Sequence, residues 1–367
     1  MIYLDYQATT PLAPEVVEAM APWIGDKFAN PHAPYTSGRE AAAAIEVARS
    51  EVTKAIGLAG GRSVFTGSAT EALNWAIKGT LGWKGGKHFV TLATEHAAVL
   101  DCAEWAQGVG HRVTVLPVGA DGLVSLDAVR AAVTDGCDLV AAMLVNNEIG
   151  VIQPVAEIAA IAHDAGARML CDAVQGLGRV AIPDGPDLVA ASAHKIHGPK
   201  GIGALWMRGG CEPETLIHGG GQEEGLRSGT LSPALAVGFG AAAKLARERF
   251  DEDHAHVEDL WSLALETLGK DWTINGSTDR RYRGNLNIRR EGLDAARLLA
   301  DCRDLAISLG SACASGSGRP SHVLKAIGLT TAEARSSVRI GFGRYTSADE
   351  LGQALARINA AAEAQRA

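Results

Sequence analysis

The sequence predicts an α/β protein with a large domain, built on a mostly parallel mixed sheet flanked by helices, and a smaller α+β domain. Its 367 residues are more than one hydrophobic core comfortably holds. From about residue 60 to residue 210, short β-rich segments alternate with helical patterns, which is typical of crossover helices over a buried parallel sheet. After about residue 249 the apolar runs become fewer, which indicates a second unit.

The expected elements of the large domain follow one another along the chain. Strands are expected where β-branched and apolar residues form short runs bounded by turn residues. These runs are residues 63–65, 88–92, 112–116, 138–145, 168–171, 187–191 and 203–207. A long Ala-rich helix is expected over residues 232–249, with Ser232 as its candidate N-cap. We therefore assign residues 15–249 to the large domain, which would carry any ligand site at its strand ends.

The rest of the chain, residues 1–14 and 250–367, is expected to form the small domain. Its apolar residues recur at strand spacing in two places and at helical spacing in two others. The expected strands cover residues 285–288 and 306–308, and the expected helices cover residues 292–302 and 347–364. Strands mixed with amphipathic helices in this way are typical of an α+β unit.

Composition and charge limit the possible functions. The chain is 47% hydrophobic and 21% charged, with a formal net charge of -8, which is typical of a soluble globular protein. Binding to nucleic acid requires clustered Lys and Arg, and no basic run occurs, so we expect no such partner. The opening residues MIYLDYQATT lack a signal-peptide pattern, and no run of about 18 apolar residues occurs. We expect a cytoplasmic protein without a membrane partner.

One of the six cysteines lies in an unusual context. The cysteines form no CxxC pair and no His-spaced set, so neither a metal site nor a disulfide framework is expected. Five of them are expected to be small apolar fillers. Cys313 lies instead in a run of small residues, 310–318, which offers nothing bulky to bury a thiol. We expect a flexible, exposed cysteine there.

Polar clusters follow several of the expected strands, at the strand ends where open parallel sheets bind ligands. The strongest cluster is residues 192–201, in which Lys195 comes directly after a strand among small and polar residues. A lysine in this place can form a Schiff base with an aldehyde cofactor. The alternative is an ordinary solvated loop lysine, and the neighbouring clusters favour the cofactor.

Two further clusters would complete a cofactor site. Asp172 ends another expected strand and could pair with a pyridine nitrogen, which keeps the ring an electron sink; the alternative is a helix N-cap. The turn 66–71 lies between a strand and a helix, so its backbone N–H groups and the hydroxyls of Ser68 or Thr70 could hold a phosphate. The alternative for this turn is a plain helix cap.

Four other segments offer matching chemistry. His96 follows a strand end and could stack on a ring and transfer protons. Asn146 and Asn147 place amide groups at another strand end, and the Gly-rich loop 219–230 could complete a phosphate cup in a neighbouring subunit. Arg339 lies within a strand pattern, where a bidentate carboxylate partner would explain it. The alternatives are a structural histidine, a polar turn and a surface salt bridge.

Together and in this order, the segments resemble the class-V aminotransferase-like enzymes of fold-type I, which use pyridoxal 5'-phosphate (PLP), and more narrowly the cysteine desulfurases of the NifS and IscS type. The resemblance runs from YLDYQATTP at residues 3–11 to RIGFGR at residues 339–344, nearly the full chain. Cys313 precedes Arg339 by 26 residues, which resembles the long-loop spacing of the NifS and IscS group. The resemblance implies conversion of L-cysteine to L-alanine, with the sulfur held as a persulfide on Cys313.

The resemblance also implies a role for each candidate residue. The catalytic residues would be Cys313, which attacks the substrate sulfur, Lys195, which forms the Schiff base, and His96, which stacks on the ring as acid and base. Asp172 would bind the pyridine nitrogen and Gln175 the ring oxygen. The phosphate would be held by Ala69, Thr70, Ser192 and His194, with Thr230 reaching in from the partner subunit of a homodimer. The substrate carboxylate would be bound by Asn147 and Arg339.

The resemblance leaves the partner open and has two kinds of rival. It implies a protein sulfur acceptor, such as an iron–sulfur scaffold, without saying which pathway is served. An aminotransferase or a selenocysteine lyase would need the same PLP-binding residues, and the expected flexible cysteine favours the desulfurase. A non-catalytic scaffold or sulfur-relay protein is disfavoured because Lys195, Asp172, His96 and Cys313 are all present.

Overall fold

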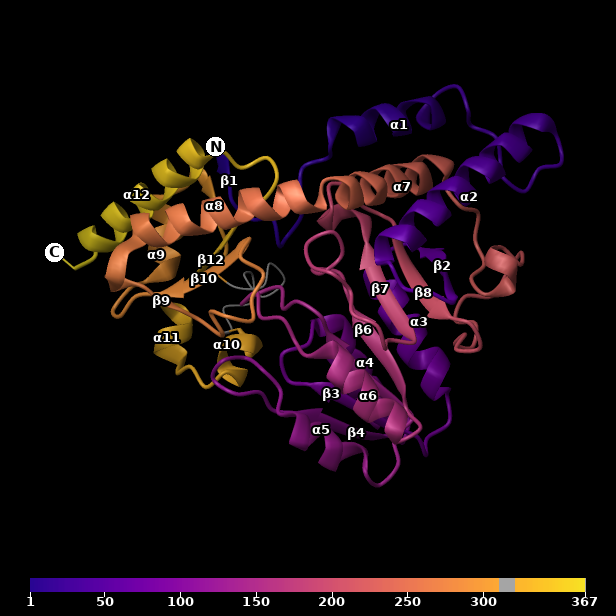
Figure 1. Cartoon of the computed structure of the whole chain (residues 1–367), viewed down its shortest axis with the longest axis horizontal. Coiled ribbons are helices and arrows are strands. Elements are labelled where there is room, and N and C mark those ends of the chain that lie inside the picture. Colours follow the sequence, from indigo (N-terminus) through magenta and orange to yellow (C-terminus); the bar gives the residue numbers. More distant parts are fainter. Residues whose placement is uncertain (310–320, 367) are drawn as a thin grey trace.

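A seven-stranded sheet forms the centre of the larger group of elements in the computed structural model, which describes residues 1–309 and 321–366 (Figure 1). The strand order is β2-β8-β7-β6-β5-β3-β4; β8 runs antiparallel to its two neighbours and the other pairings are parallel. The strands are β2 (Gly61–Thr66), β3 (His88–Leu92), β4 (Arg112–Leu116), β5 (Leu139–Met143), β6 (Arg168–Asp172), β7 (Leu188–Ser192) and β8 (Gly203–Arg208). The predicted mostly parallel sheet is confirmed.

Helices cover both faces of this sheet, and the alternation of side chains along β5 shows how. Leu139 and Ala141 pack into one apolar cluster with α3 (Ala69–Leu81) and α4 (Ala97–Gly108). Val140 and Ala142 pack on the opposite face, in the cluster that includes residues of three other helices. These helices are α2 (Thr36–Ile56), α6 (Val155–Asp164) and α7 (Pro233–Glu248). Burial on both faces explains why the strands are near-continuous apolar runs.

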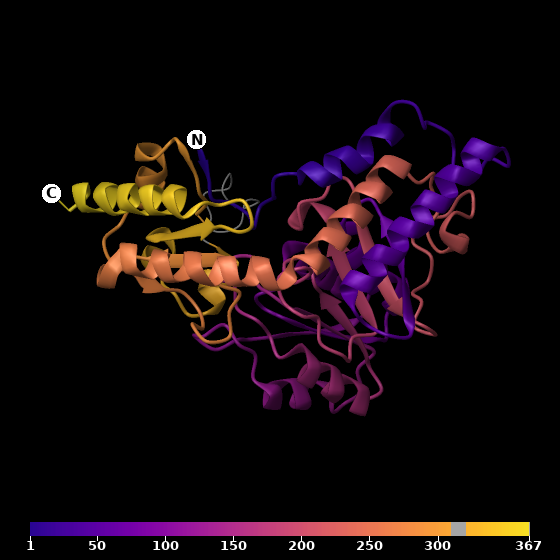
Figure 2. The same ribbon diagram turned by 45° about the horizontal axis from the view of Figure 1, so that its top comes forward.

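Two further helices, α1 and α5, complete this group. α1 (Pro14–Ile24) packs on α7, and α2 packs on α7 beside it, as Figure 2 shows. α5 (Leu126–Val133) packs on α6 at the β4 side. The predicted N-cap of α7 is confirmed, since the Ser232 hydroxyl accepts a hydrogen bond from the backbone N–H of Leu235.

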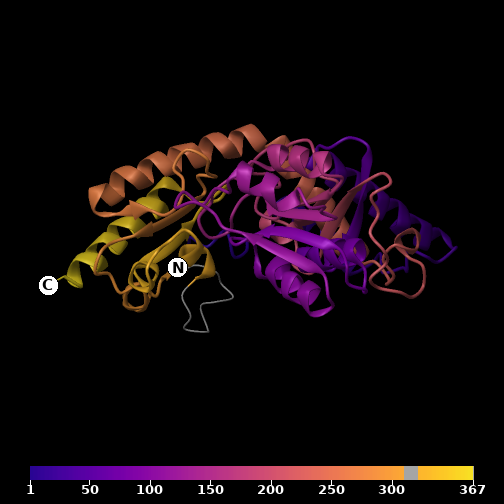
Figure 3. The ribbon, with the colours of Figure 1, turned by 90° about the horizontal axis from the view of Figure 1, so that it is seen from below.

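The second group of elements lies beside the first, as seen from below in Figure 3. It contains two small sheets, one of β1 (Ile2–Tyr3) with β11 (Leu305–Ala306), the other of β9 (Thr273–Ile274), β10 (Asn285–Arg289) and β12 (Ser337–Gly341). Its helices are α8 (Phe250–Leu268), α9 (Ala295–Asp301), α10 (His322–Ala326), α11 (Thr331–Arg335) and α12 (Ala348–Ala364). The start of the chain therefore pairs with a segment of its last third.

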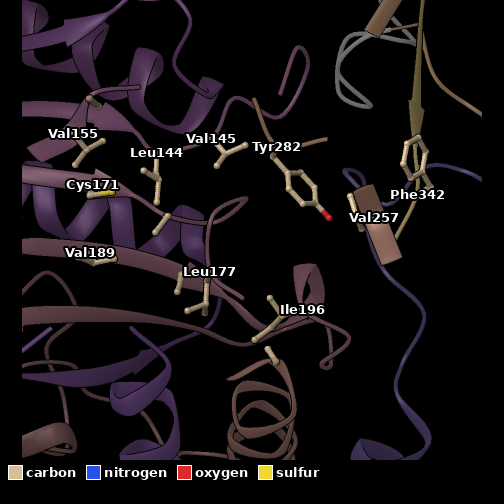
Figure 4. Packing of buried hydrophobic residues seen from close by; sticks show 14 of the residues in the cluster. Leu144, Val145, Val155, Cys171, Leu177, Val189, Ile196, Val257, Tyr282 and Phe342 are labelled. Atoms are coloured by element: carbon tan, nitrogen blue, oxygen red, sulfur yellow. The ribbon is translucent and has the colours of Figure 1, made fainter. Parts of the chain in front are cut away.

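One apolar core runs through both groups. The largest cluster of buried residues contains side chains of the large sheet together with side chains of α8, β10, β12 and α12. Figure 4 labels members of both groups: Leu144, Cys171, Leu177 and Val189 from the first, Val257, Tyr282 and Phe342 from the second. A shared core of this kind favours a fixed arrangement of the two groups.

The structure differs from the expectations for the second group in two places. The strand expected over residues 306–308 is β11, which covers only Leu305–Ala306; Ser308 makes an isolated bridge to Arg339 instead. The long helix α8 was not expected at all, although it begins directly after α7. No helix within residues 1–309 or 321–366 is both long enough and apolar enough to cross a membrane.

Candidate active site

Ten of the predicted site residues line one cavity of about 410 Å³ at the carboxyl ends of β5, β6 and β7. They are Ala69, Thr70, His96, Asn147, Asp172, Gln175, Ser192, His194, Lys195 and Arg339. Ligands of open parallel sheets bind at this edge because the loops after the strands leave a crevice there. The exposed Thr230 does not line the cavity within its own chain, and Cys313 lies outside the described residues.

Lys195 is held at the cavity by a short 3-10 turn, Ala193–Lys195, directly after β7. Its Nζ donates hydrogen bonds to the backbone oxygens of Gln7 at 2.6 Å and Ala8 at 2.7 Å. Burial lowers the pKa of Lys195 to about 7, and the guanidinium groups of Arg179 and Arg339 act in the same direction. A substantial fraction of the amine is therefore neutral near pH 7, as a nucleophilic amine must be.

Asp172, at the end of β6, and His96, in the loop after β3, both line the cavity, and β5 lies between these two strands in the sheet. One carboxylate oxygen of Asp172 accepts from the backbone N–H of Val174 at 2.9 Å, in a turn rather than at the start of a helix. Burial raises the pKa of Asp172, whereas the charges of His96 and Lys195 lower it. His96 caps α4, because its Nδ1 accepts from the backbone N–H of Ala98 at 3.1 Å. A neutral His96 therefore carries its proton on Nε2.

The beginning of α3 offers an anion site to the same cavity. The Ser68 hydroxyl accepts from the backbone N–H of Glu71 at 3.2 Å, so the alternative of a helix cap is correct for Ser68. The next backbone N–H groups, of Ala69 and Thr70, lie in the first turn, where no helical carbonyl can accept from them. Gly203 lets β8 approach this turn, because a Cβ there would lie 2.6 Å from the Ala69 nitrogen.

His194 completes this end of the cavity as a neutral ring. Burial lowers the pKa of His194 to about 4, and the charges of Lys195 and Lys200 act in the same direction. One ring nitrogen, Nδ1, lies 3.1 Å from the Thr9 hydroxyl. A neutral imidazole can donate one hydrogen bond to a phosphate without a charge of its own.

Arg339 lies on β12 and reaches the cavity from the second group of elements. Its side chain is 1% exposed, so the alternative of a surface salt bridge is wrong. Nη2 lies 2.8 Å from a carboxylate oxygen of Asp5, and Nη1 donates to the backbone oxygen of Asn147 at 3.0 Å. The guanidinium therefore has a carboxylate partner, although the contact with Asp5 runs through one nitrogen and is not the bidentate pair that was expected.

Sequence reasoning missed the contribution of the first ten residues to this site. Gln7 and Ala8 line the cavity, Asp5 pairs with Arg339, and Thr10 donates to the His194 backbone oxygen at 2.9 Å. None of these residues follows a strand of the large sheet, so the strand-end rule could not find them. The unusual polar run after an apolar start was the available signal.

A buried acid beneath the cavity was also missed. Glu95 is fully buried, one carboxylate oxygen accepts from the Met143 backbone N–H at 2.8 Å, and the other has no partner within the described ranges. Burial raises the pKa of Glu95 well above its usual value. The Glu95 backbone oxygen lies 2.9 Å from His322 Nε2, and the Ser321 hydroxyl donates to Glu148. Residues 321 and 322, which directly follow the segment that contains Cys313, are thus held by Glu148 and Glu95, the sequence neighbours of the lining residues Asn147 and His96.

Comparison with known proteins identifies the family. The model of the family described as aminotransferase class-V matches residues 2–353. The chain belongs to the class-V aminotransferase family. Cysteine desulfurase IscS of Rickettsia bellii (strain OSU 85-389) is 43% identical, over 96% of this chain and 89% of its own length. The predicted resemblance to the cysteine desulfurases of the NifS and IscS type is confirmed.

Solved structures of similar proteins have the same fold. A NifS-like protein is 31% identical with a TM-score of 0.89, over 98% of both chains. A protein called SspA, solved in complex with cysteine, is 35% identical with a TM-score of 0.81, over 95% of this chain and 100% of its own. The fold observed here is therefore the fold of NifS-like enzymes.

Proposed function

We propose that this member of the class-V aminotransferase family is a PLP-dependent cysteine desulfurase, which converts L-cysteine to L-alanine and holds the sulfur as a persulfide on Cys313. The observation that carries the proposal is the convergence in one cavity of a lysine whose pKa is about 7, a buried aspartate and a helix N-terminus. The family and the IscS relative support the choice of reaction.

The residues of the cavity fit PLP, which is an aldehyde, a pyridine and a phosphate on one ring. Lys195 would hold the aldehyde carbon, Asp172 the ring nitrogen and Gln175 the ring oxygen, while His96 would stack on the ring. A protonated ring nitrogen would offset the cost of burying the Asp172 carboxylate, because opposite charges favour the ionised form. The residues proposed for the phosphate are Ala69, Thr70, Ser192 and His194, with Thr230 of the partner subunit of a homodimer.

When bound, PLP supplies an electron sink for charge that develops on the substrate α-carbon. The chain's own residues would do the rest. Arg339 and Asn147 would bind the carboxylate of L-cysteine, and this orients the α-hydrogen and the thiol. Lys195 would remove the α-proton, for which a pKa near the working pH is suited. His96 would donate and accept protons through Nε2.

The sulfur step is proposed for Cys313. Its thiolate would attack the substrate sulfur, so that an S–S bond forms as the substrate C–S bond breaks. The electron pair of that C–S bond stays on the carbon, which takes up protons to give alanine; the sulfur becomes the outer atom of a Cys313 persulfide. A second thiolate then takes over this sulfur, and we propose a protein acceptor such as an iron–sulfur scaffold.

The first test is release of alanine and sulfide from L-cysteine with a thiol reductant. The wild type is expected to release both in equal amounts, and Cys313→Ala is expected to release neither. Cys211→Ala is the matched control, because Cys211 is the one partly exposed free cysteine among the residues that the structure describes. Full turnover by Cys313→Ala would contradict the proposed role of Cys313, and amino transfer to a keto acid would favour an aminotransferase.

A further inference from the structure

Arg179 lies directly behind Lys195, on the turn that follows β6. Its Nη2 donates to the Lys195 backbone oxygen at 2.9 Å and to the Tyr6 backbone oxygen at 3.2 Å, and its Nη1 donates to the side-chain oxygen of Gln175. The guanidinium stacks on the Tyr282 ring, 5.3 Å from its centroid. No carboxylate pairs with it within residues 1–309 and 321–366. This cation is therefore held by neutral acceptors, and it connects the Lys195 backbone with the Gln175 side chain.

Arg179 determines which way the Gln175 amide faces. A guanidinium can only donate hydrogen bonds, so the Gln175 group beside it must be the carbonyl oxygen. The Gln175 NH2 then lies on the other side, where it donates to the Gln7 backbone oxygen at 2.9 Å. The reverse orientation would place NH2 against the guanidinium and oxygen against oxygen, so two contacts would become repulsive. The NH2 group has two N–H bonds and the Gln7 oxygen takes one of them, so Gln175, which lines the cavity, keeps a second donor for a ligand.

Arg179 itself lies outside that cavity. It lines a separate small cavity of about 40 Å³, together with Tyr6, Lys195 and Tyr282. Lys195 lines both cavities, so it forms the wall between the ligand side and the Arg179 side. Any effect of Arg179 on a ligand must therefore pass through the residues that it holds.

We propose that Arg179 is a positioning residue, which fixes the Gln175 amide as a hydrogen-bond donor and so adapts the cavity to a ligand with an anionic ring oxygen. The proposal rests on the proposed function, because the ligand in question is PLP. The charge of Arg179 also favours PLP binding. It lies close enough to Lys195 to disfavour an ammonium there, so it favours the neutral amine that reacts with an aldehyde.

The proposal is tested with a double-mutant cycle on PLP binding to the apoprotein. Arg179→Met removes the donors and the charge at similar length, and Gln175→Ala removes the amide that Arg179 is proposed to orient. Binding is measured at about pH 9, so that the charge effect of Arg179 on the Lys195 amine does not contribute. We expect Arg179→Met to raise the Kd of PLP there roughly tenfold in the wild-type background, and less than about twofold when Gln175 is already alanine. Equal effects in the two backgrounds, or no effect in the wild type, would overturn the proposal.

Two controls make the outcome specific. Arg130→Met removes an exposed arginine on α5, whose side chain pairs with Asp127 one turn earlier, and it is expected to leave the Kd unchanged. Thermal unfolding of each apoprotein separates lost positioning from lost folding. If Arg179→Met does not fold, Arg179→Lys, which keeps the charge but not the fork of donors, must show the same non-additivity with Gln175→Ala, or the proposal fails. A wild type that binds no PLP would refute the proposed function instead.

Discussion

The Lys195 amine is buried beside two arginines, and its ionisation is therefore expected to limit how fast the apoprotein attaches an aldehyde. Its pKa is about 7, so the nucleophilic neutral form increases as pH rises through 7 and is lost below it. The rate of attachment of PLP, followed by absorbance between about pH 5.5 and 9, should rise with a midpoint near 7. A rate that still rises at pH 9 without a plateau, as for a lysine with the ordinary pKa of about 10, would show that burial does not act on this amine.

Arg179 provides the internal control for that titration. Because its charge lowers the pKa of Lys195, Arg179→Met should move the midpoint to higher pH, so that attachment at neutral pH becomes slower. Arg179→Lys keeps the charge and should leave the midpoint close to the wild-type value. A midpoint that is the same in all three proteins would mean that burial alone sets the pKa.

Glu95 is a second buried ionisable residue, and burial shifts its pKa upward, opposite to the downward shift of Lys195. Its folded-state pKa is raised by burial, so its protonated form is the stable one in the fold. Its effect on the free energy of unfolding is absent at low pH and becomes destabilising as pH rises above the unfolded value of about 4.5. Glu95→Gln keeps the acceptor for Met143 and cannot ionise, so it should unfold at a higher temperature than the wild type at pH 8, with a smaller gain at pH 5.

The matched control for Glu95 is Glu157→Gln, an exposed glutamate on α6, which should show no pH-dependent gain. If Glu95→Gln is less stable than the wild type at pH 8, then the folded protein stabilises the ionised carboxylate of Glu95. That outcome would contradict the raised pKa.

The strand-end rule explains which residues could be found from sequence. Lys195, Asp172 and His96 each follow a buried strand, and parallel strands bring their carboxyl ends to one edge. Asp5 and Arg179 obey no such local rule. Asp5 meets Arg339 across 334 positions of sequence, and Arg179 acts through a hydrogen-bond orientation that only coordinates reveal.

At the scale of elements, the bounds of a helix or strand were best predicted where its residues form a clear apolar run. β3 and β4 have the predicted bounds, since their apolar runs stand between clear turns. α8 was missed because its first turn holds Asp251, Glu252 and Asp253, although the buried residues Val257, Leu260, Trp261, Ala264 and Leu268 recur at helical spacing. β1 and β11 have two residues each, too few for any periodicity. Such short strands exist only because the tertiary structure brings them together.

The contact between β8 and the start of α3 gives a prediction for an element junction. A Cβ on Gly203 would lie 2.5 Å from the Ser68 carbonyl carbon and 2.6 Å from the Ala69 nitrogen, so Gly203→Ala must displace the first turn of α3. We expect the Kd of PLP to rise by about tenfold or more, which corresponds to about 1.4 kcal/mol of lost anion binding at this helix N-terminus. Titration of the apoprotein with PLP measures it.

Gly209→Ala is the control, because Gly209 directly follows the same strand and a Cβ there would meet only the Gly60 oxygen, at 3.5 Å. It should leave PLP binding unchanged. If both variants bind PLP like the wild type, the first turn of α3 does not hold the phosphate.

At the scale of the whole molecule, the side of the cavity that we propose binds the substrate is built by both groups of elements. Three consecutive backbone oxygens after β5, of Asn147, Glu148 and Ile149, accept hydrogen bonds from side chains of the second group. The donors are Arg339 and Asn285 for the first oxygen, Asn287 for the second and Arg281 for the third. The division into domains at residues 14 and 249 stays a prediction, but the turn with Asn147 is held from the side assigned to the small domain.

Arg281 is the strongest of these connections, and its removal should affect stability and substrate binding together. The side chain is buried and donates to four backbone oxygens, including Ile149 at 2.5 Å and Ser277 at 2.8 Å, while it stacks on Trp261. Arg281→Met leaves these oxygens without donors, so we expect a loss of about 2–4 kcal/mol in the free energy of unfolding. Because the Asn147 turn loosens, KM for L-cysteine should rise more than kcat falls.

The neighbouring Arg280→Met is the matched control: Arg280 is 52% exposed and its ion pair with Glu157 is 3.9 Å long. A stability loss without a change in KM would show that Arg281 supports the fold but not the substrate side of the cavity.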